Sequence, residues 1–583
     1  MNIFSHFSKI INALVTDNAS AWGLSDLSNL DRMAVEPPRD QSHGDIATNV
    51  ALILAKPNKL NPRDLGQKIA DELSKLDIVD TVEIAGPGFI NMRISNRFWQ
   101  QSVADILKAG GNFGKPNDGK DQMVNVEYVS ANPTGPLHIG HCRGAVLGDA
   151  IASILDFAGY KVTKEYYVND AGAQVDILAR STYLRYAEAI TKKEAQIPEG
   201  LYPGEYLIPV GEALAKQYGD QFINTDESEY LAIFRDFSIE KMLDLIKNQL
   251  TELGVQHEVF TSERSFVESG KMNDALTELR EKGIVYEGIL PKPKGKEDSG
   301  WQPLELTLFR SSAYGDDVDR PLFKSDGTHT YFASDIAYHY DKYLRGAKIL
   351  IDILGADHGG YVKRMQAAVK AMSDNNATLD AKLCQMVNLM DNGEPVKMSK
   401  RAGNFITTTD VVEKVGKDVV RFIMLTRSAD TQLDFDLTKV IEMSKDNPVF
   451  YVQYAHARVS SVKKQLEETF ADINLSDAAL QTADLSLLTD EGELNIMRNL
   501  LRWPSVVAGT AEKHEPHRIA NYLYETAAQL HAQWNRGNDD ASLRFVILND
   551  VKLSIARFAL LRAVQNTIAI GLTLFGVEPR EKM

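Results

Sequence analysis

The segment from Met123 to Val168 constrains the fold more than any other part of the chain. MVNVEYV alternates apolar and polar residues as a strand does, ANPTGP is typical of a turn, and apolar residues then recur at helical spacing as far as Gly159. A second strand-like run, KVTKEYYV, follows at once. A strand, a loop, a helix and a second strand in this order predict the first half of a doubly wound parallel sheet that binds a nucleotide.

The rest of the chain predicts further domains around this α/β unit, because 583 residues with 44% apolar content can bury several cores. Strand-like patches at GIVYEG, THTYFAS and KILIDILGA would complete the second half of the sheet. The segment after residue 406 is almost wholly helical in pattern. The expected units are an α+β domain at 1–118, the first half of the sheet at 119–185, a charged helical insertion at 186–290, the second half of the sheet at 291–405, a connecting helical segment at 406–445 and an all-α bundle at 446–583.

Composition excludes several classes of protein. Cys142 and Cys384 are the only cysteines, which is too few for a disulfide framework or a Cys-rich zinc site, so we expect no protein-bound metal. The first twenty residues lack the features of a signal peptide, and no apolar run approaches the roughly 18 residues that span a bilayer. We therefore expect a soluble cytoplasmic protein. The net charge of −16 does not exclude nucleic acid, since binding needs only a local basic patch.

The first motif with chemistry is NPTGPLHIGH, residues 132–141, between the first strand and its helix. A helix N-terminus presents unpaired N–H groups and a partial positive charge, which suit phosphates. His138 and His141 lie one turn apart, so both imidazoles can donate hydrogen bonds to a phosphoryl group as charge develops on it. The ordinary alternative is a pair of surface histidines at a helix end, and the strand-loop-helix context favours the phosphate site.

The second motif is KMSKRAG, residues 397–403, which begins 397 − 138 = 259 residues beyond the first histidine. A basic loop by itself is usually a solvated surface. However, the two halves of a doubly wound sheet bring their loops to one ligand at the carboxyl ends of the strands. Imidazoles from one side and ammonium groups from the other could then hold a triphosphate.

HIGH (138–141) and KMSKR (397–401) resemble the two signature motifs of class I aminoacyl-tRNA synthetases, and the longer strings VEYVSANPTGPLHIGHCRGAVLGD, VNDAGAQ, FYVQYAHAR and HGDIATNVALILAK resemble arginyl-tRNA synthetases. The resemblance implies that L-arginine reacts with ATP, which carries Mg²⁺, to give arginyl-adenylate, and that the arginyl group passes to the terminal adenosine of tRNA(Arg). It implies catalytic roles for His138, His141, Lys397 and Lys400. The implied ATP-binding residues are Pro133, Gly135, His138, Gly140, His141, Met398, Ser399 and Lys400.

The same resemblance implies an arginine pocket and two tRNA contacts, one between the N-terminal domain and the D-loop and one between the C-terminal bundle and the anticodon. A guanidinium is matched best by carboxylates. The implied arginine-binding residues are Glu127, Asn132, Tyr331, Asp335, Asp357 and His358. The implied tRNA-binding residues are Phe89, Asn91, Tyr451, Tyr454, Arg458 and Met583, with Tyr522 and Trp534 as weaker candidates. The structural alternatives are that Asp335 caps a helix, Glu127 is an exposed strand residue and the tyrosines belong to a helix core.

Two other functions compete with an arginine-tRNA ligase, which the family leads us to expect as a monomer. The first is a class I synthetase for another amino acid, but Glu127 and Asp335 argue against an acidic or apolar substrate. The second is a synthetase-like RNA-binding or regulatory protein without catalysis. Both histidines and both lysines of the signatures are present, and a protein without catalysis need not keep them.

Overall fold

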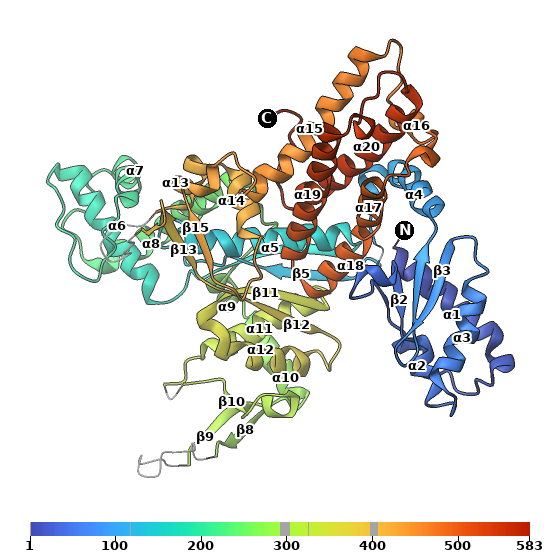
Figure 1. Cartoon of the computed structure of the whole chain (residues 1–583). Helices are drawn as coiled ribbons and strands as arrows, with labels where there is room; N and C mark the ends of the chain where they lie inside the picture. The colour runs from blue at the N-terminus through green and yellow to red at the C-terminus, as the bar shows by residue number, and fades with distance from the viewer. Residues whose placement is uncertain (1, 117, 292–302, 325, 397–405) are drawn as a thin grey trace.

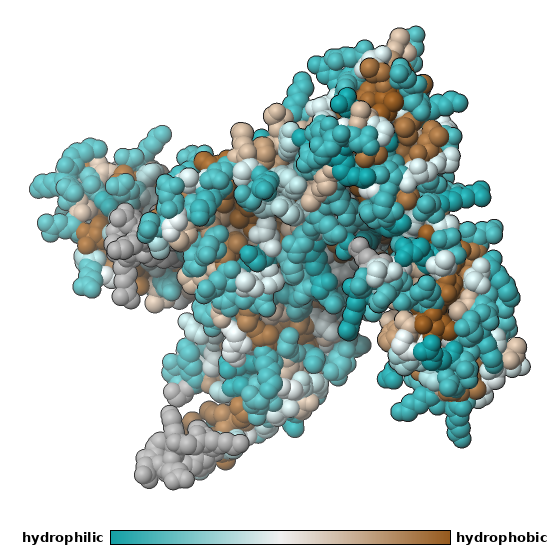
Figure 2. All heavy atoms as spheres, viewed as in Figure 1, coloured by the Kyte–Doolittle hydropathy of each residue, from teal (hydrophilic) through white to brown (hydrophobic). Residues whose placement is uncertain are grey.

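The computed structural model describes residues 2–116, 118–291, 303–324, 326–396 and 406–583. Lys397, Met398, Ser399 and Lys400, which carry the predicted second motif, lie outside these ranges. Figure 1 shows a central sheet from which other parts extend: the N-terminal domain in blue, a turquoise helical lobe, a yellow-green arm at the bottom, and the C-terminal bundle in orange and red. Figure 2 shows that hydrophilic residues cover most of the visible face.

The central element is a five-stranded parallel sheet in the order β12-β11-β5-β6-β7. Its strands are β5 (Met123–Glu127), β6 (Lys161–Val168), β7 (Val259–Ser262), β11 (Ile349–Gly355) and β12 (Thr378–Cys384). β5 pairs with β6 on one side and with β11 on the other, so the direction of winding reverses between β5 and β11. The predicted doubly wound parallel sheet is confirmed, and its switch point is where such sheets bind ligands.

Helices cover both faces of this sheet, α5 (Ile139–Phe157) on one and α11 (Tyr331–Leu344) with α12 (Gly359–Met372) on the other (Figure 1). Neighbouring residues of a strand point to opposite faces. In β11, Ile351 accordingly belongs to the same core as α5, whereas Leu350 belongs to the core that α11 and α12 form. Burial on both faces explains why β11 is the nearly continuous apolar run ILIDIL.

The N-terminal domain is an antiparallel sheet packed against helices, as the α+β prediction required. The sheet has the order β1-β2-β4-β3, and Phe7 and Ile11 of the first helix are fully buried in its core. The elements are α1 (Ile3–Trp22), β1 (Val35–Glu36), β2 (Ile46–Thr48), α2 (Val50–Ala55), α3 (Pro62–Leu73), β3 (Val79–Ala85), β4 (Phe89–Ile94) and α4 (Asn96–Ala109).

The C-terminal unit is the predicted all-α bundle. Its helices are α15 (Pro448–Thr469), α16 (Asp477–Leu480), α17 (Glu491–Leu500), α18 (Trp503–Lys513), α19 (His517–Asp539) and α20 (Val551–Leu574). By length and composition α20 could cross a membrane, although the sequence led us to expect no such segment. In the structure 78% of its most apolar window is buried, as in the central helix of a bundle.

Three expectations about secondary structure were wrong. THTYFAS is not a strand, because Thr330 caps α11 by accepting a hydrogen bond from the Ala333 N–H, at 3.3 Å. The region 186–290 is not only helical, since β7 lies within it and joins the central sheet. The segment after 406 contains a strand, β15 (Leu433–Asp436), which pairs in parallel with β13 (Val387–Asp391). A four-residue strand with a distant partner leaves only a short pattern in the sequence.

The remaining elements flank the central sheet. GIVYEG forms β8, which is not part of the parallel sheet but of a separate three-stranded sheet, β10-β9-β8. The helical lobe, residues 173–252, has its own core, which includes Val175, Tyr186 and Phe234. The bounds are α6 (Ala173–Thr191), α7 (Ile208–Tyr218), α8 (Glu227–Glu252), α9 (Glu263–Glu268), α10 (Lys271–Glu281), β8 (Val285–Ile289), β9 (Glu305–Phe309), β10 (Arg320–Pro321), β14 (Glu394–Pro395), α13 (Thr408–Val415) and α14 (Lys417–Met424).

Arg421 of α14 ties three of these units together, and its side chain is fully buried. It donates to the Asp149 carboxylate of α5 at 2.5 Å, to the Phe575 carbonyl at the end of α20 at 2.5 Å and to the Leu253 carbonyl after α8 at 3.1 Å. A buried charge is tolerated only where such partners surround it.

We expect the substitution Arg421→Met to lower the stability of the protein by about 3–5 kcal/mol, because it leaves the Asp149 carboxylate buried without this partner. The control is Arg180→Met, which removes an ion pair to Glu227 whose side chains are 39% and 46% exposed, and which should change stability by less than about 1 kcal/mol. Urea unfolding followed by circular dichroism measures both. Equal stability of the two variants would contradict the structural role of Arg421.

Candidate active site

The N-terminus of α5 carries the two predicted histidines at the switch point of the sheet. His138 is the N-cap, and its Nδ1 accepts from the Gly140 N–H at 3.1 Å. The His141 Nδ1 accepts from the His138 N–H at 3.2 Å, and the two rings stack with centroids 3.9 Å apart. Because both Nδ1 atoms act as acceptors, the neutral rings carry their proton on Nε2, which makes Nε2 the donor.

The chain that follows the second motif meets the first motif directly. Thr407 forms an antiparallel bridge with His138, and the Thr408 N–H donates to the Leu137 carbonyl at 2.9 Å. The Cys142 thiol of α5 donates to the Thr408 hydroxyl at 3.3 Å. The chain directly after the second motif therefore contacts the first motif. This contact is expected if the two motifs bind one ligand.

Five carboxylates from different elements lie close enough to one another to shift pKa values, and we call them the acidic cluster: Glu127, Asp170, Glu263, Asp335 and Asp352. Asp335 of α11 has a pKa raised to about 6, first because it is buried and then because Glu127 and Asp352 are negative, although the Tyr361 hydroxyl donates to it. Burial, Asp335 and Asp170 raise the pKa of Glu263, the first residue of α9. Within the described part of the chain, neither Asp335 nor Glu263 forms an ion pair with a cationic side chain. Clustered carboxylates without a cation favour a positively charged ligand.

A buried lysine neutralises the neighbouring carboxylates. The Lys342 ammonium is fully buried and donates to Glu127 at 2.5 Å and to Asp352 at 3.4 Å, and these two carboxylates raise its pKa against the opposing effect of burial. His339 forms an imidazole–carboxylate contact with Asp352 at 2.8 Å. Glu127, His339 and Asp352 offer ligand atoms within 4.8 Å of one another, as a metal site would. The Lys342 ammonium bonds to two of these three groups, Glu127 and Asp352, and supplies a positive charge there.

Comparison with known proteins decides the family. The family of class I tRNA synthetase (R) catalytic domains matches residues 102–461, the arginyl tRNA synthetase N terminal domain matches 3–94, and the DALR anticodon binding domain matches 452–583. Arginine–tRNA ligases of Azorhizobium caulinodans and Ruegeria pomeroyi are 54% and 53% identical to this chain over the whole of both proteins. The chain belongs to the arginyl-tRNA synthetase family.

Solved structures agree with this membership. A Campylobacter jejuni protein described as an arginyl-tRNA synthetase shares 33% identity and a TM-score of 0.71 over 84% of this chain and all of its own. The Thermus thermophilus arginyl-tRNA synthetase has a TM-score of 0.71 over 94% of this chain at 21% identity, a likeness that concerns the fold.

The anticodon-binding domain of this synthetase presents an aromatic face on α15 and α19. Arg458 lies at its centre, donating to the Tyr454 hydroxyl at 2.8 Å and contacting the His531 Nδ1 at 2.9 Å, with its guanidinium 4.4 Å from the centre of the Trp534 ring. Tyr454 is 37% exposed, so part of the face is open to solvent. We define the anticodon face as Phe450, Tyr451, Tyr454, Arg458, Tyr524, His531 and Trp534.

The other predicted tRNA contacts differ in accessibility. Tyr522 is only 3% exposed and donates to the Asn499 carbonyl, so this weaker candidate is a core residue. Phe89 is 42% exposed at the start of β4 and Met583 is 50% exposed, so both are accessible to RNA. Asn91 is 7% exposed, so its side chain faces the N-terminal domain and not solvent.

The predicted arginine contacts divide in a similar way. Glu127 and Asp335 lie in the acidic cluster, whereas Asn132 donates to Gln174 of the helical lobe at 2.6 Å. Tyr331 is 81% exposed at the start of α11, with the Lys324 ammonium 5.9 Å from its ring centre. Asp357 and His358 follow β11, and their side chains are 85% and 53% exposed. The structure thus brings two of the six predicted residues together at the cluster.

Reasoning from the sequence missed Glu263, Tyr361 and Lys342 in or beside the acidic cluster, and Tyr524 and His531 on the anticodon face. The signal for Glu263 would have been its place directly after β7, because residues at the carboxyl end of a parallel strand lie at the ligand side of the sheet, but the region 186–290 was expected to be helical. The positions of the other four residues depend on which faces of their helices pack together. No local sequence pattern predicts that packing.

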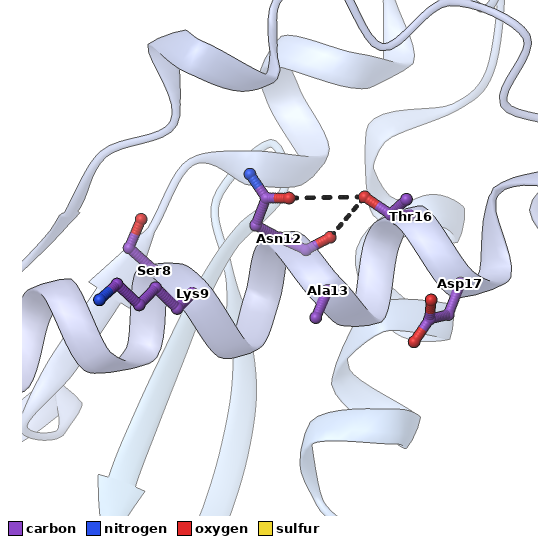
Figure 3. A pocket seen from close by; sticks show the side chains of 6 residues that line it. All are labelled: Ser8, Lys9, Asn12, Ala13, Thr16 and Asp17. Atoms are coloured by element: carbon purple, nitrogen blue, oxygen red, sulfur yellow. Dashed lines mark hydrogen bonds between the residues drawn. The ribbon is translucent and has the colours of Figure 1, made fainter.

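A surface hollow lies far from this chemistry, on α1 (Figure 3). Its lining is Ser8, Lys9, Asn12, Ala13, Thr16 and Asp17. The Thr16 hydroxyl already donates to the Asn12 carbonyl at 2.8 Å one turn earlier on the same helix. These contacts are ordinary for an exposed helix face, and we assign the hollow no substrate.

The raised pKa of Asp335 predicts how the binding of arginine depends on pH. A guanidinium binds the ionised carboxylate, and that form is lost as pH falls through about 6. The dissociation constant of arginine, measured by titration calorimetry, should be flat at pH 7–8 and rise by up to about tenfold per unit below pH 6. ATP binding is the control and should not follow the same curve. An arginine affinity unchanged between pH 8 and pH 5 would contradict the role of Asp335.

Proposed function

We propose that the region between the N-terminus of α5 and the acidic cluster is where this arginine–tRNA ligase joins arginine to ATP and then to tRNA(Arg). The observation that carries the proposal is a group of carboxylates in which Asp335 raises the pKa of Glu263 and Glu127 raises that of Asp335, on the sheet whose helix α5 carries two imidazole donors at its N-terminus. The first feature suits a cationic amino acid and the second a polyphosphate. Their adjacency at one switch point suits a reaction between the two ligands.

In the first step the arginine carboxylate attacks the α-phosphorus of ATP, the bond to the bridging oxygen breaks, and pyrophosphate leaves with its Mg²⁺. The Nε2 donors of His138 and His141 stabilise the charge that develops on the phosphoryl oxygens. By resemblance to the family signature, Lys397 and Lys400 would neutralise the charge of the leaving pyrophosphate. Pro133, Gly135 and Gly140 belong to the first motif, residues 132–141, and Met398 and Ser399 belong to the same sequence motif as the lysines.

The enzyme would select arginine through the N–H donors of its planar guanidinium group, which can bond to two carboxylates at once. Asp335 and Glu263 can each accept from the guanidinium, whereas Glu127 is already paired with Lys342. Lysine has one ammonium and would leave one of the two acceptors unmatched in a poorly solvated site. Asn132 would lie at the α-amino group, and Tyr331, Asp357 and His358 at the open side of the pocket.

The tRNA meets the enzyme at two further surfaces. Unstacked anticodon bases would stack on Tyr451 and Tyr454 of the anticodon face and take hydrogen bonds from Arg458. Met583 would add an apolar contact. Phe89 would touch the D-loop, while Asn91 supports β4 from inside the domain. We further propose that the enzyme acts as a monomer in the cytoplasm, away from any membrane.

The direct test of the substrate is aminoacylation of total tRNA with each amino acid in turn. Only arginine should be attached, and pyrophosphate exchange should follow arginine in the same way. Asp335→Asn should weaken arginine use by at least about a hundredfold, because it removes a charge-assisted pair, while leaving the KM for ATP within about twofold. Attachment of lysine or glutamine in place of arginine would overturn the assignment.

We expect Lys400→Ala to slow adenylate formation by at least about a hundredfold, the scale of one lost transition-state donor, with tRNA affinity nearly unchanged. The control is Lys414→Ala, an exposed lysine of α13 that pairs with Asp391 at 3.2 Å. Single-turnover adenylation and a filter-binding assay measure the two properties. If Lys400→Ala formed adenylate as fast as Lys414→Ala, the role given to Lys400 would be wrong.

A further inference from the structure

The helical lobe bonds to the turn that leads into α5 at three points. The Asn132 amide donates to Gln174 of α6 at 2.6 Å, the Tyr206 hydroxyl donates to the Thr134 carbonyl at 2.8 Å, and the Leu137 N–H donates to the Gln249 side-chain oxygen at 2.7 Å. These lobe residues are spread over residues 174–249 of the sequence. The turn, residues 132–137, is thus held from outside the central sheet.

Gln249 of α8 is the innermost of the three contacts, with 3% exposure. The Leu137 N–H that it satisfies belongs to a residue that is 1% exposed and that directly precedes the N-cap His138. The Gln249 amide also donates to the Thr409 hydroxyl of α13, at 3.4 Å. The Gln249 side chain therefore bonds to both of the segments that meet here, the one that leads into α5 and the one that begins α13.

Tyr206 holds the middle of the turn, on the short segment that precedes α7. A Cβ atom added at Gly135 would lie 2.9 Å from the Tyr206 hydroxyl oxygen, so the ring packs directly against the glycine backbone. Burial raises the pKa of Tyr206, which keeps its hydroxyl protonated and able to donate to Thr134. The contact fixes both the position and the direction of the Thr134 carbonyl.

The lobe can act as a rigid support because it folds around its own core. Tyr186 illustrates this, since its hydroxyl donates to the Gly219 carbonyl at 2.6 Å and accepts from the Phe222 N–H at 3.2 Å, both within the lobe. In contrast, Tyr206 and Gln249 direct their polar groups outward, to the turn. Side chains that leave a self-contained core to bond a functional turn are suited to positioning it.

We propose that the helical lobe positions the ATP-binding turn, and that Tyr206 and Gln249 are the positioning residues through which it does so. This inference rests on the proposed function, because it takes the turn and the two histidines as the site of the ATP phosphates. Neither residue touches the reacting atoms. Both act by setting where the His138 backbone, and with it the stacked pair of imidazoles, stands relative to the nucleotide.

The test compares Tyr206→Phe and Gln249→Met with Tyr186→Phe, which removes a hydroxyl bonded only inside the lobe. Pyrophosphate exchange at saturating tRNA gives kcat and the KM values for ATP and arginine, and thermal melting reports the fold. We expect each of the first two variants to lower kcat/KM for ATP by about five- to tenfold, the scale of one hydrogen bond, with the KM for arginine within about twofold. Tyr186→Phe should lower the melting temperature without changing either KM.

Gln249→Glu keeps an oxygen that accepts from the Leu137 N–H and should recover most of the activity lost in Gln249→Met. His141→Ala separates this inference from the proposed function. If His141→Ala kept full ATP turnover, the assignment of the turn itself would fail. If His141→Ala were slow while Tyr206→Phe and Gln249→Met matched Tyr186→Phe in kcat/KM for ATP, or if the KM for arginine rose as much as that for ATP, the positioning role of the lobe would be overturned.

Discussion

The parallel pairing of β5 with β11 is the constraint on which the rest of the molecule depends. It joins residues 123–127 to residues 349–352 and creates the point from which the chain winds in opposite directions. The first motif, residues 132–141, follows β5 and leads into α5. Helix α11, which carries Asp335 near its N-terminus, covers the opposite face of the sheet. The Lys342 ammonium, bonded to Glu127 of β5 and Asp352 of β11, holds the two strands together where the substrates would meet.

The sequence predicted the fold wherever a segment carries its own pattern. The unit from 123 to 168 is strand, helix and strand as its alternation and periodicity require, and the N-terminal and C-terminal units have the predicted classes. Predictions failed where a local pattern competes with a cap or a distant partner. Thr330 turns an apolar run into the start of a helix, and β15 is a strand only because β13 lies beside it.

The candidate site was likewise predictable where its residues belong to a motif, and not where they come together only through the fold. His138, His141, Glu127 and Asp335 were identified from motifs, and the structure places them at one switch point. Glu263 escaped notice because its proximity to Asp335 depends on β7 adding to the edge of the sheet, far along the chain. Asn91 shows the opposite case, since its position in a motif gave no indication that β4 turns its side chain into the domain.

The measurement that tests the account most directly is a crystal structure with a non-hydrolysable arginyl-adenylate analogue bound. The account predicts that the guanidinium lies within salt-bridge distance of Asp335 and Glu263, and that the phosphate lies at the N-terminus of α5 within hydrogen-bond distance of His138 or His141. An analogue bound elsewhere, or bound at the N-terminus of α5 with its guanidinium directed away from both carboxylates, would contradict it.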